Sequence, residues 1–138
     1  MISPVLPRLL LFCQRFARWI FVPALAIVVW GELRPSQPEA GNWDKVLHFT
    51  AYFGLAAIAT IALGRRRSGG WAALALALFG GALEIVQSFV GRDAEWGDEF
   101  ANIAGASLGF LAGWASMREM QRLLGIFPRK GDQNEHDR

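Results

Sequence analysis

Long apolar runs without charges, separated by short charged segments, constrain the fold of this 138-residue chain more than any other feature. Hydrophobic residues make up 53% of the sequence and charged residues only 19%. A helix needs about 20 apolar residues to cross the hydrocarbon core of a bilayer. Four runs approach that length: Phe16 to Leu33, Val46 to Leu63, Trp71 to Val90 and Phe100 to Met117. We therefore predict an all-α integral membrane bundle of four transmembrane helices.

The first run is interpreted as a retained membrane helix. Arg18 lies near its start and Pro23 lies inside it, and both are tolerated in membrane helices when neighbouring helices or headgroups satisfy them. No small-residue cleavage motif follows Trp30, as a cleavable signal would require. The single cysteine, Cys13, excludes an intramolecular disulfide and is interpreted as a buried or interfacial thiol.

The basic residues are distributed unequally between the connections. Eleven of the 14 Lys and Arg residues lie before or at the start of the first run, between the second and third runs, or after the fourth. Only Arg34, Lys45 and Arg92 lie in the other two connections. By the positive-inside rule, we expect a multi-pass membrane protein with both termini in the cytoplasm. We expect residues 1–127 to form the transmembrane domain and residues 128–138 to form a disordered polar cytoplasmic tail.

Uncommon polar residues gather at the outward ends of three runs. They are Asp44, Lys45, His48 and Tyr52 in the second run, Glu84 and Gln87 in the third, Arg92 just beyond it, and Asp98 and Asn102 at the start of the fourth. A carboxylate that faces lipid costs about 2 kcal/mol or more, so these groups should turn inward. We expect one connected polar cup in the outer half of the bundle, with Glu84 paired to Lys45, His48 or Arg92.

Glycines recur at every fourth position of the fourth run, at Gly105, Gly109 and Gly113. Small residues at this spacing form a groove into which another helix packs closely. Gly80 and Gly81 of the third run are the expected matching surface.

The ordered set of motifs resembles the VanZ-like membrane proteins. The motifs are "DKVLHFTAY" from Asp44, "EIVQ" from Glu84, Arg92, and "NIAGASLG" from Asn102 with Asp98 before it. The match covers about half of the chain, from Asp44 to Gly113. The segment "RDAEWGD" departs from the family pattern because Asp93 and Glu95 make it more acidic, which leaves ligand specificity open.

The resemblance implies the fold, a location in the bacterial inner (cytoplasmic) membrane and the candidate site residues, but no reaction. The family is named for a protein associated with tolerance to the lipidated glycopeptide teicoplanin. The binding residues implied by the motifs are Asp44, Lys45, Tyr52, Gln87, Arg92 and Asn102.

The chemistry of the residues leaves two roles open for the cup. His48 with Glu84, Asp44 or Asp98 could form an acid–base pair, and His48, Glu84 and Asp98 are the candidate catalytic residues. The same polar residues could instead only fix the helices in register. One histidine and several carboxylates could hold a divalent metal, but the lack of a second histidine within the runs and of a ligand motif favours no metal site and no cofactor.

Two functions therefore stay open. The first is a membrane protein whose cup binds an envelope lipid headgroup, a lipid-linked envelope intermediate or a lipophilic, teicoplanin-like antibiotic. The alternative is a membrane-embedded enzyme that uses a His/carboxylate pair on a lipid-linked phosphate or headgroup. The sequence has no long basic run and no nucleic-acid motif, so we do not expect a nucleic-acid partner. The oligomeric state stays open.

Overall fold

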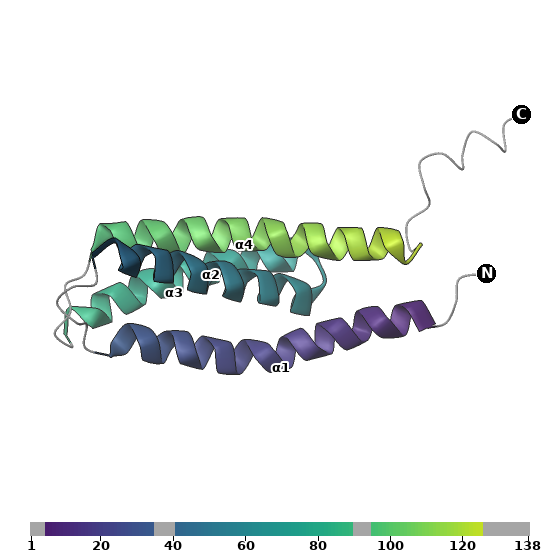
Figure 1. Ribbon diagram of the computed structural model, residues 1–138, viewed down its shortest axis with the longest axis horizontal. Coiled ribbons are helices and arrows are strands. Elements are labelled where there is room, and N and C mark those ends of the chain that lie inside the picture. Colours follow the sequence, from purple (N-terminus) through teal and green to yellow (C-terminus); the bar gives the residue numbers. More distant parts are fainter. Residues whose placement is uncertain (1–4, 35–40, 90–94, 126–138) are drawn as a thin grey trace, which may run out of the picture.

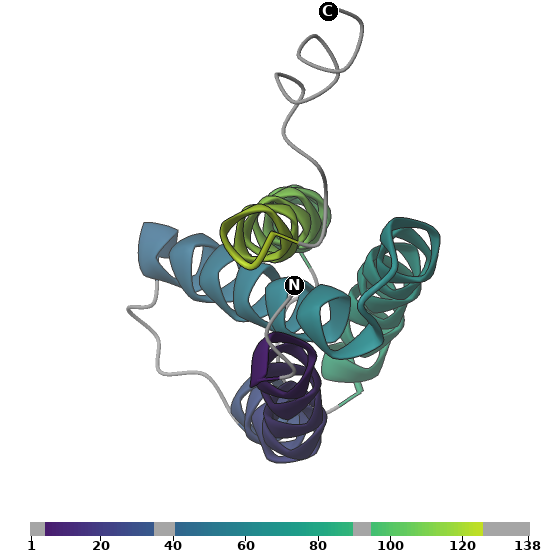
Figure 2. The same ribbon diagram turned by 90° about the vertical axis from the view of Figure 1, so that its right-hand side faces the viewer.

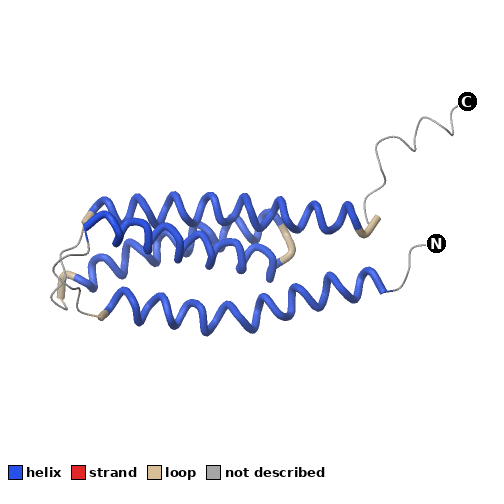
Figure 3. Tube along the Cα trace, in the orientation of Figure 1, coloured by secondary structure: helices blue, strands red, loops and turns tan. Residues whose placement is uncertain are grey.

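The computed structural model describes residues 5–34, 41–89 and 95–125, and these residues form four helices and no strand. The helices are α1 (Val5–Leu33), α2 (Gly41–Leu63), α3 (Arg66–Gln87) and α4 (Trp96–Leu123). Figure 3 shows helix through nearly all of the described chain. The all-α prediction is confirmed.

Three helices, α1, α2 and α3, are long and apolar enough to span a membrane. These three helices indicate a membrane protein. The fourth helix is less apolar because its core face carries glycines and Asn102 in place of large aliphatic side chains.

The observed helices extend beyond the predicted apolar runs. Helices α1 and α2 end at the predicted residues, Leu33 and Leu63, but begin several residues earlier. Helix α3 ends at Gln87, before the predicted end at Val90, which lies outside the described residues. The extensions of α2, α3 and α4 are charged or polar segments, which can be helical without being apolar. The extension of α1 is mostly apolar, but Arg8 and Arg15 interrupt it.

Helix α2 lies at the centre of the bundle. It contacts each of the other helices and packs most extensively against α4, and the end-on view shows it between α1, α3 and α4 (Figure 2). Helix α1 is the least buried of the three apolar helices, and it runs along the lower edge of the bundle in Figure 1. The small core consists of Tyr52, Leu55, Ala56, Ala73, Leu76 and Ala106.

The glycines of α4 form the predicted close-packing seam, but their partner is α2. A Cβ atom added to Gly105 would collide with the carbonyl oxygen of Phe49, and one added to Gly109 would collide with that of Phe53. At Gly113 the same atom would lie 2.7 Å from the carbonyl oxygen of Ala57. The prediction that Gly80 and Gly81 of α3 match this groove is wrong, because the groove packs directly on the backbone of α2.

The bundle has two chemically distinct ends. We call the end where α1 and α3 finish and α2 and α4 begin the cup end, and the opposite end the Arg end (Figure 1). At the Arg end, Arg18 Nε donates a hydrogen bond to the carbonyl oxygen of Ala62 at 3.1 Å. Arg66 and Arg118 lie over the ring of Trp114, at 4.7 and 5.4 Å from its centroid. Arg18 thus caps a carbonyl group at the end of α2, and Arg66 connects the start of α3 to Trp114 near the end of α4.

Candidate functional site

Buried polar side chains are concentrated at the cup end. Among the described residues, the buried polar or charged side chains are Glu32, His48, Thr60, Glu84, Gln87, Asp98 and Asn102, and only Thr60 lies away from the cup end. We call the remaining six residues, together with Asp44, Tyr52 and Glu99, the cup. Its members are Glu32, Asp44, His48, Tyr52, Glu84, Gln87, Asp98, Glu99 and Asn102. All four helices contribute to it, because each of them either begins or ends at this level of the bundle.

A chain of hydrogen bonds orients the imidazole of His48. Asn102 Nδ2 donates to Glu99 Oε2 at 3.3 Å, which directs the amide oxygen of Asn102 toward His48. That oxygen lies 3.0 Å from His48 Nδ1 and can only accept a hydrogen bond. Nδ1 therefore carries the proton, and Nε2 of a neutral His48 keeps its lone pair.

His48 also lies between two buried carboxylates. Its Nδ1 is 3.7 Å from Glu32 Oε1 and 3.7 Å from Glu84 Oε1. Glu84 was expected to pair with Lys45, His48 or Arg92, and it lies beside His48. His48 is 3% exposed, so its imidazole is enclosed by these groups.

Glu32 completes the cup from α1, and the sequence analysis did not include it. Tyr52 Oη donates to Glu32 Oε2 at 3.4 Å, and Gln87 Nε2 donates to the backbone carbonyl oxygen of Glu32 at 3.0 Å. The signal was a single carboxylate one residue before the end of an apolar run, in "WGEL". It was overlooked because no neighbouring polar residue in α1 shares its face.

Lys45 lies at the rim of the cup and is engaged by acidic residues. Its Nζ lies 2.7 Å from Glu95 Oε2 and 3.8 Å from Asp98 Oδ1. The aliphatic part of Lys45 covers Gly97, where a Cβ atom would approach the lysine Cε at 2.5 Å. Lys45 is thus held by carboxylates of the cup rim. The other expected cation, Arg92, lies outside the described residues.

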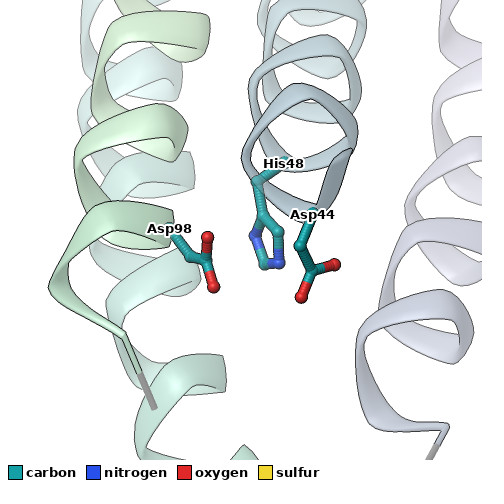
Figure 4. Close-up of side chains that lie close together, drawn as sticks. All are labelled: Asp44, His48 and Asp98. Carbon is teal, nitrogen blue, oxygen red and sulfur yellow. The ribbon is translucent and has the colours of Figure 1, made fainter. Parts of the chain in front are cut away.

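Asp98 turns into the cup. The N-cap of α4 is Glu95, and Asp98 lies in the first turn of the helix. Its carboxylate points toward the ring of His48, and that of Asp44 lies on the other side of the ring (Figure 4). Burial raises the pKa of the Asp98 carboxyl, although the charges of His48 and Lys45 oppose the shift. Burial likewise raises the pKa of Glu99, against its hydrogen bond from Asn102.

Two pockets flank the cup on different sides. One, of about 250 Å³, lies between α1 and α2, and its lining combines Glu32, Asp44 and His48 with the apolar side chains of Ile27, Val28, Leu47 and Ala51. The other, of about 550 Å³, lies between α3 and α4, and combines Glu84, Glu95 and Glu99 with Leu78, Ala82, Ile85 and Trp96. Each pocket places carboxylates next to an apolar wall.

The structure brings most of the predicted site residues together. Asp44, His48, Tyr52, Glu84, Gln87, Asp98 and Asn102 lie in or around one polar cluster, with Lys45 at its rim. Glu32 and Glu99 are additions to that set. The convergence of the cup residues at one end of the bundle is therefore observed, and their chemical role is a separate question.

Searches of protein-family models, curated proteins and solved structures found no match to this chain.

Proposed function

We propose that this protein crosses the bacterial cytoplasmic membrane four times, with both termini inside and the cup facing outward. The unequal distribution of basic residues supports this orientation. The seam supports the fourth span: Gly105, Gly109 and Gly113 lie against α2 at residues 49–57, in the middle of its apolar run. Since α4 packs against α2 at that level, the two helices occupy the same depth of the bilayer. The motifs quoted above support membership of the VanZ-like family.

The cup, in this proposal, binds the polar head of an amphiphile. The observation that carries it is the pocket between α1 and α2, where Glu32, Asp44 and His48 lie beside an apolar wall. A headgroup could reach the carboxylates while its acyl chain stays along the apolar side chains. Polar groups fix the orientation of a ligand in such sites, and apolar groups supply most of the contact area.

The charge of the cup favours particular headgroups. Its carboxylates are Glu32, Asp44, Glu84, Asp98 and Glu99, and the cation at its rim, Lys45, is already engaged by Glu95. A head that carries an ammonium group or donates hydrogen bonds from hydroxyl groups complements these acceptors better than a bare anion. An aminated envelope lipid or a lipophilic glycopeptide antibiotic has this chemistry.

An enzyme remains the alternative because of the position of His48. Its imidazole lies 3.7 Å from the carboxylates of both Glu32 and Glu84, an arrangement suited to proton transfer at a headgroup or lipid-linked phosphate. The two functions differ in their response to Asp98→Glu. Catalysis depends on position and would be abolished, whereas binding would only be weakened.

The full chain in nanodiscs tests the proposal. Native mass spectrometry would measure retained phosphatidylethanolamine against phosphatidylglycerol, and calorimetry would measure binding of a teicoplanin-type antibiotic. We expect preferential retention of the aminated lipid, or saturable antibiotic binding, that Glu32→Gln and His48→Ala weaken. The control is Glu119→Gln, an exposed carboxylate near the Arg end.

Lipid analysis of cells that carry the wild-type protein or His48→Ala distinguishes an enzyme from a binding protein. A lipid species that appears only with the wild-type protein identifies an enzyme. Equal retention of every lipid, no antibiotic binding and unchanged lipids would contradict both functions.

A further inference from the structure

We propose that the cup binds a divalent metal ion through Asp44, His48 and Asp98. One potential ligand atom from each of these residues lies within 4.8 Å of those of the other two. Ligand atoms about 2.0–2.2 Å from a common ion lie up to roughly 4.4 Å apart. The three atoms therefore lie close to the spacing that one shared ion requires. Figure 4 shows the ring of His48 between the two carboxylates.

The hydrogen bonds around His48 prepare it as a ligand. Asn102 accepts from Nδ1, and Asn102 is itself fixed by its bond to Glu99. This leaves the lone pair of Nε2 for a metal. Metal-binding histidines commonly donate their other ring N–H to such an outer acceptor, which fixes both the tautomer and the ring orientation.

Asp98 supplies a second, independent indication of a ligand. The residue is 3% exposed, and its Oδ1 atom has no hydrogen-bond partner within the described part of the chain. The nearest cation, Lys45 Nζ, is 3.8 Å away, which is beyond hydrogen-bonding distance. A buried carboxylate oxygen without a hydrogen bond is unfavourable, and a metal ion would satisfy it directly.

The donor set indicates the class of metal. One imidazole nitrogen and two carboxylate oxygens, without a thiolate, suit Zn²⁺ or Mn²⁺ better than a soft ion such as Cu(I). Three protein ligands leave at least one coordination position open, as in metal sites that bind a substrate or water. The sequence indicated no metal site because it offered one histidine within the runs. The fold changes that expectation by placing carboxylates from α2 and α4 beside this histidine.

Mn²⁺ binding to the full chain tests the site with a readout that does not measure amphiphile binding. The protein would carry His136→Ala, to remove the histidine of the tail, and would be stripped with chelator in phosphatidylcholine nanodiscs. Electron paramagnetic resonance then measures free Mn²⁺ against empty nanodiscs. We expect one saturable site per chain, and binding at least about tenfold weaker in Asp98→Asn and His48→Gln. Glu119→Gln should bind as the parent does.

Two further variants keep the test decisive. Asn102→Ala removes the acceptor of His48 Nδ1 without removing a ligand, so it should weaken Mn²⁺ binding by about tenfold. Asp44→Asn changes a partly exposed ligand and serves if Asp98→Asn does not fold. No saturable binding, or binding that Asp44→Asn and Asp98→Asn leave unchanged, would overturn the proposal. Because no amphiphile is measured, failure here is distinct from failure of the proposed function.

Discussion

The middle of the bundle and its cup end are held together by opposite means. Along the seam, the glycines of α4 lie directly against backbone carbonyl groups of α2. At the cup end, the contacts are hydrogen bonds and charge pairs between side chains of all four helices. Packing along the seam requires that the glycines have no side chain, whereas packing at the cup end requires polar side chains that pair with one another.

The seam also determines the geometry of the cup. Gly105 lies against Phe49, the residue after His48, and it is three positions beyond Asn102 in α4. Residues three and four apart share a face of a helix, so Asn102 continues the stripe of the seam glycines. The distance of 3.0 Å between His48 Nδ1 and Asn102 Oδ1 is therefore a consequence of the close approach of the two backbones. Loss of the seam should abolish the cup, whereas loss of a cup residue should leave the seam intact.

Gly109→Ala should have the largest effect. Its new methyl group would collide with the carbonyl oxygen of Phe53, and a backbone atom cannot move aside as a side chain can. We expect a destabilisation of about 3 kcal/mol or more, measured by thermal unfolding in detergent. The matched control is Gly54→Ala, where a Cβ atom has no neighbour within 4 Å. That change should be neutral or stabilise α2 by up to about 1 kcal/mol. Equal effects of the two substitutions would contradict the close packing of α4 against α2 at Gly109.

Asn102→Ala should have an intermediate effect. It removes the hydrogen bonds to His48 and Glu99 from a fully buried position. Interhelical hydrogen bonds in membrane proteins contribute about 0.6 to 2 kcal/mol, so we expect a loss in that range with the fold retained. Ser107→Ala, at an exposed position of α4, is the control and should change stability by less than about 0.5 kcal/mol. A complete loss of folding in Asn102→Ala would show that the cup is required to assemble the bundle.

Gly125→Leu should have a small but measurable effect. This glycine follows α4 with a φ of 66°, a left-handed conformation that residues with a Cβ atom adopt at a cost of about 1 kcal/mol. It lies far from the seam, and an added Cβ atom would have no neighbour within 4 Å. The same unfolding assay should therefore show a loss of about 1 kcal/mol, well below that of Gly109→Ala. A larger loss than at Gly109 would mean that the end of α4 matters more than its packing face.

The sequence predicted the helices and most of the cup because both leave periodic or positional signals. Apolar runs predicted the four helices, and the four-residue spacing of Gly105, Gly109 and Gly113 predicted the close approach of α4. The partner of the seam was not predictable, because the backbone that receives the glycines at Phe49, Phe53 and Ala57 carries no small-residue pattern.

The residues that were missed share one property. Glu32 is a single carboxylate in α1, and Glu99 lies beside Asp98 in a helix start that is rich in acidic residues. Neither has a spacing that distinguishes it from a solvated residue. Only the fold shows that Tyr52 donates to Glu32 and that Asn102 donates to Glu99.

The orientation of the two ends in the membrane is tested most directly by accessibility of single cysteines. In a Cys13→Ser background, one cysteine would replace Glu95 at the cup end and another would replace Ser68 near the Arg end. Intact cells would be treated with a membrane-impermeant thiol reagent. The account predicts labelling at position 95 and protection at position 68 until the cells are opened, because the basic residues hold the Arg end in the cytoplasm. Labelling at position 68 with protection at position 95 would place the cup on the cytoplasmic side and contradict the account.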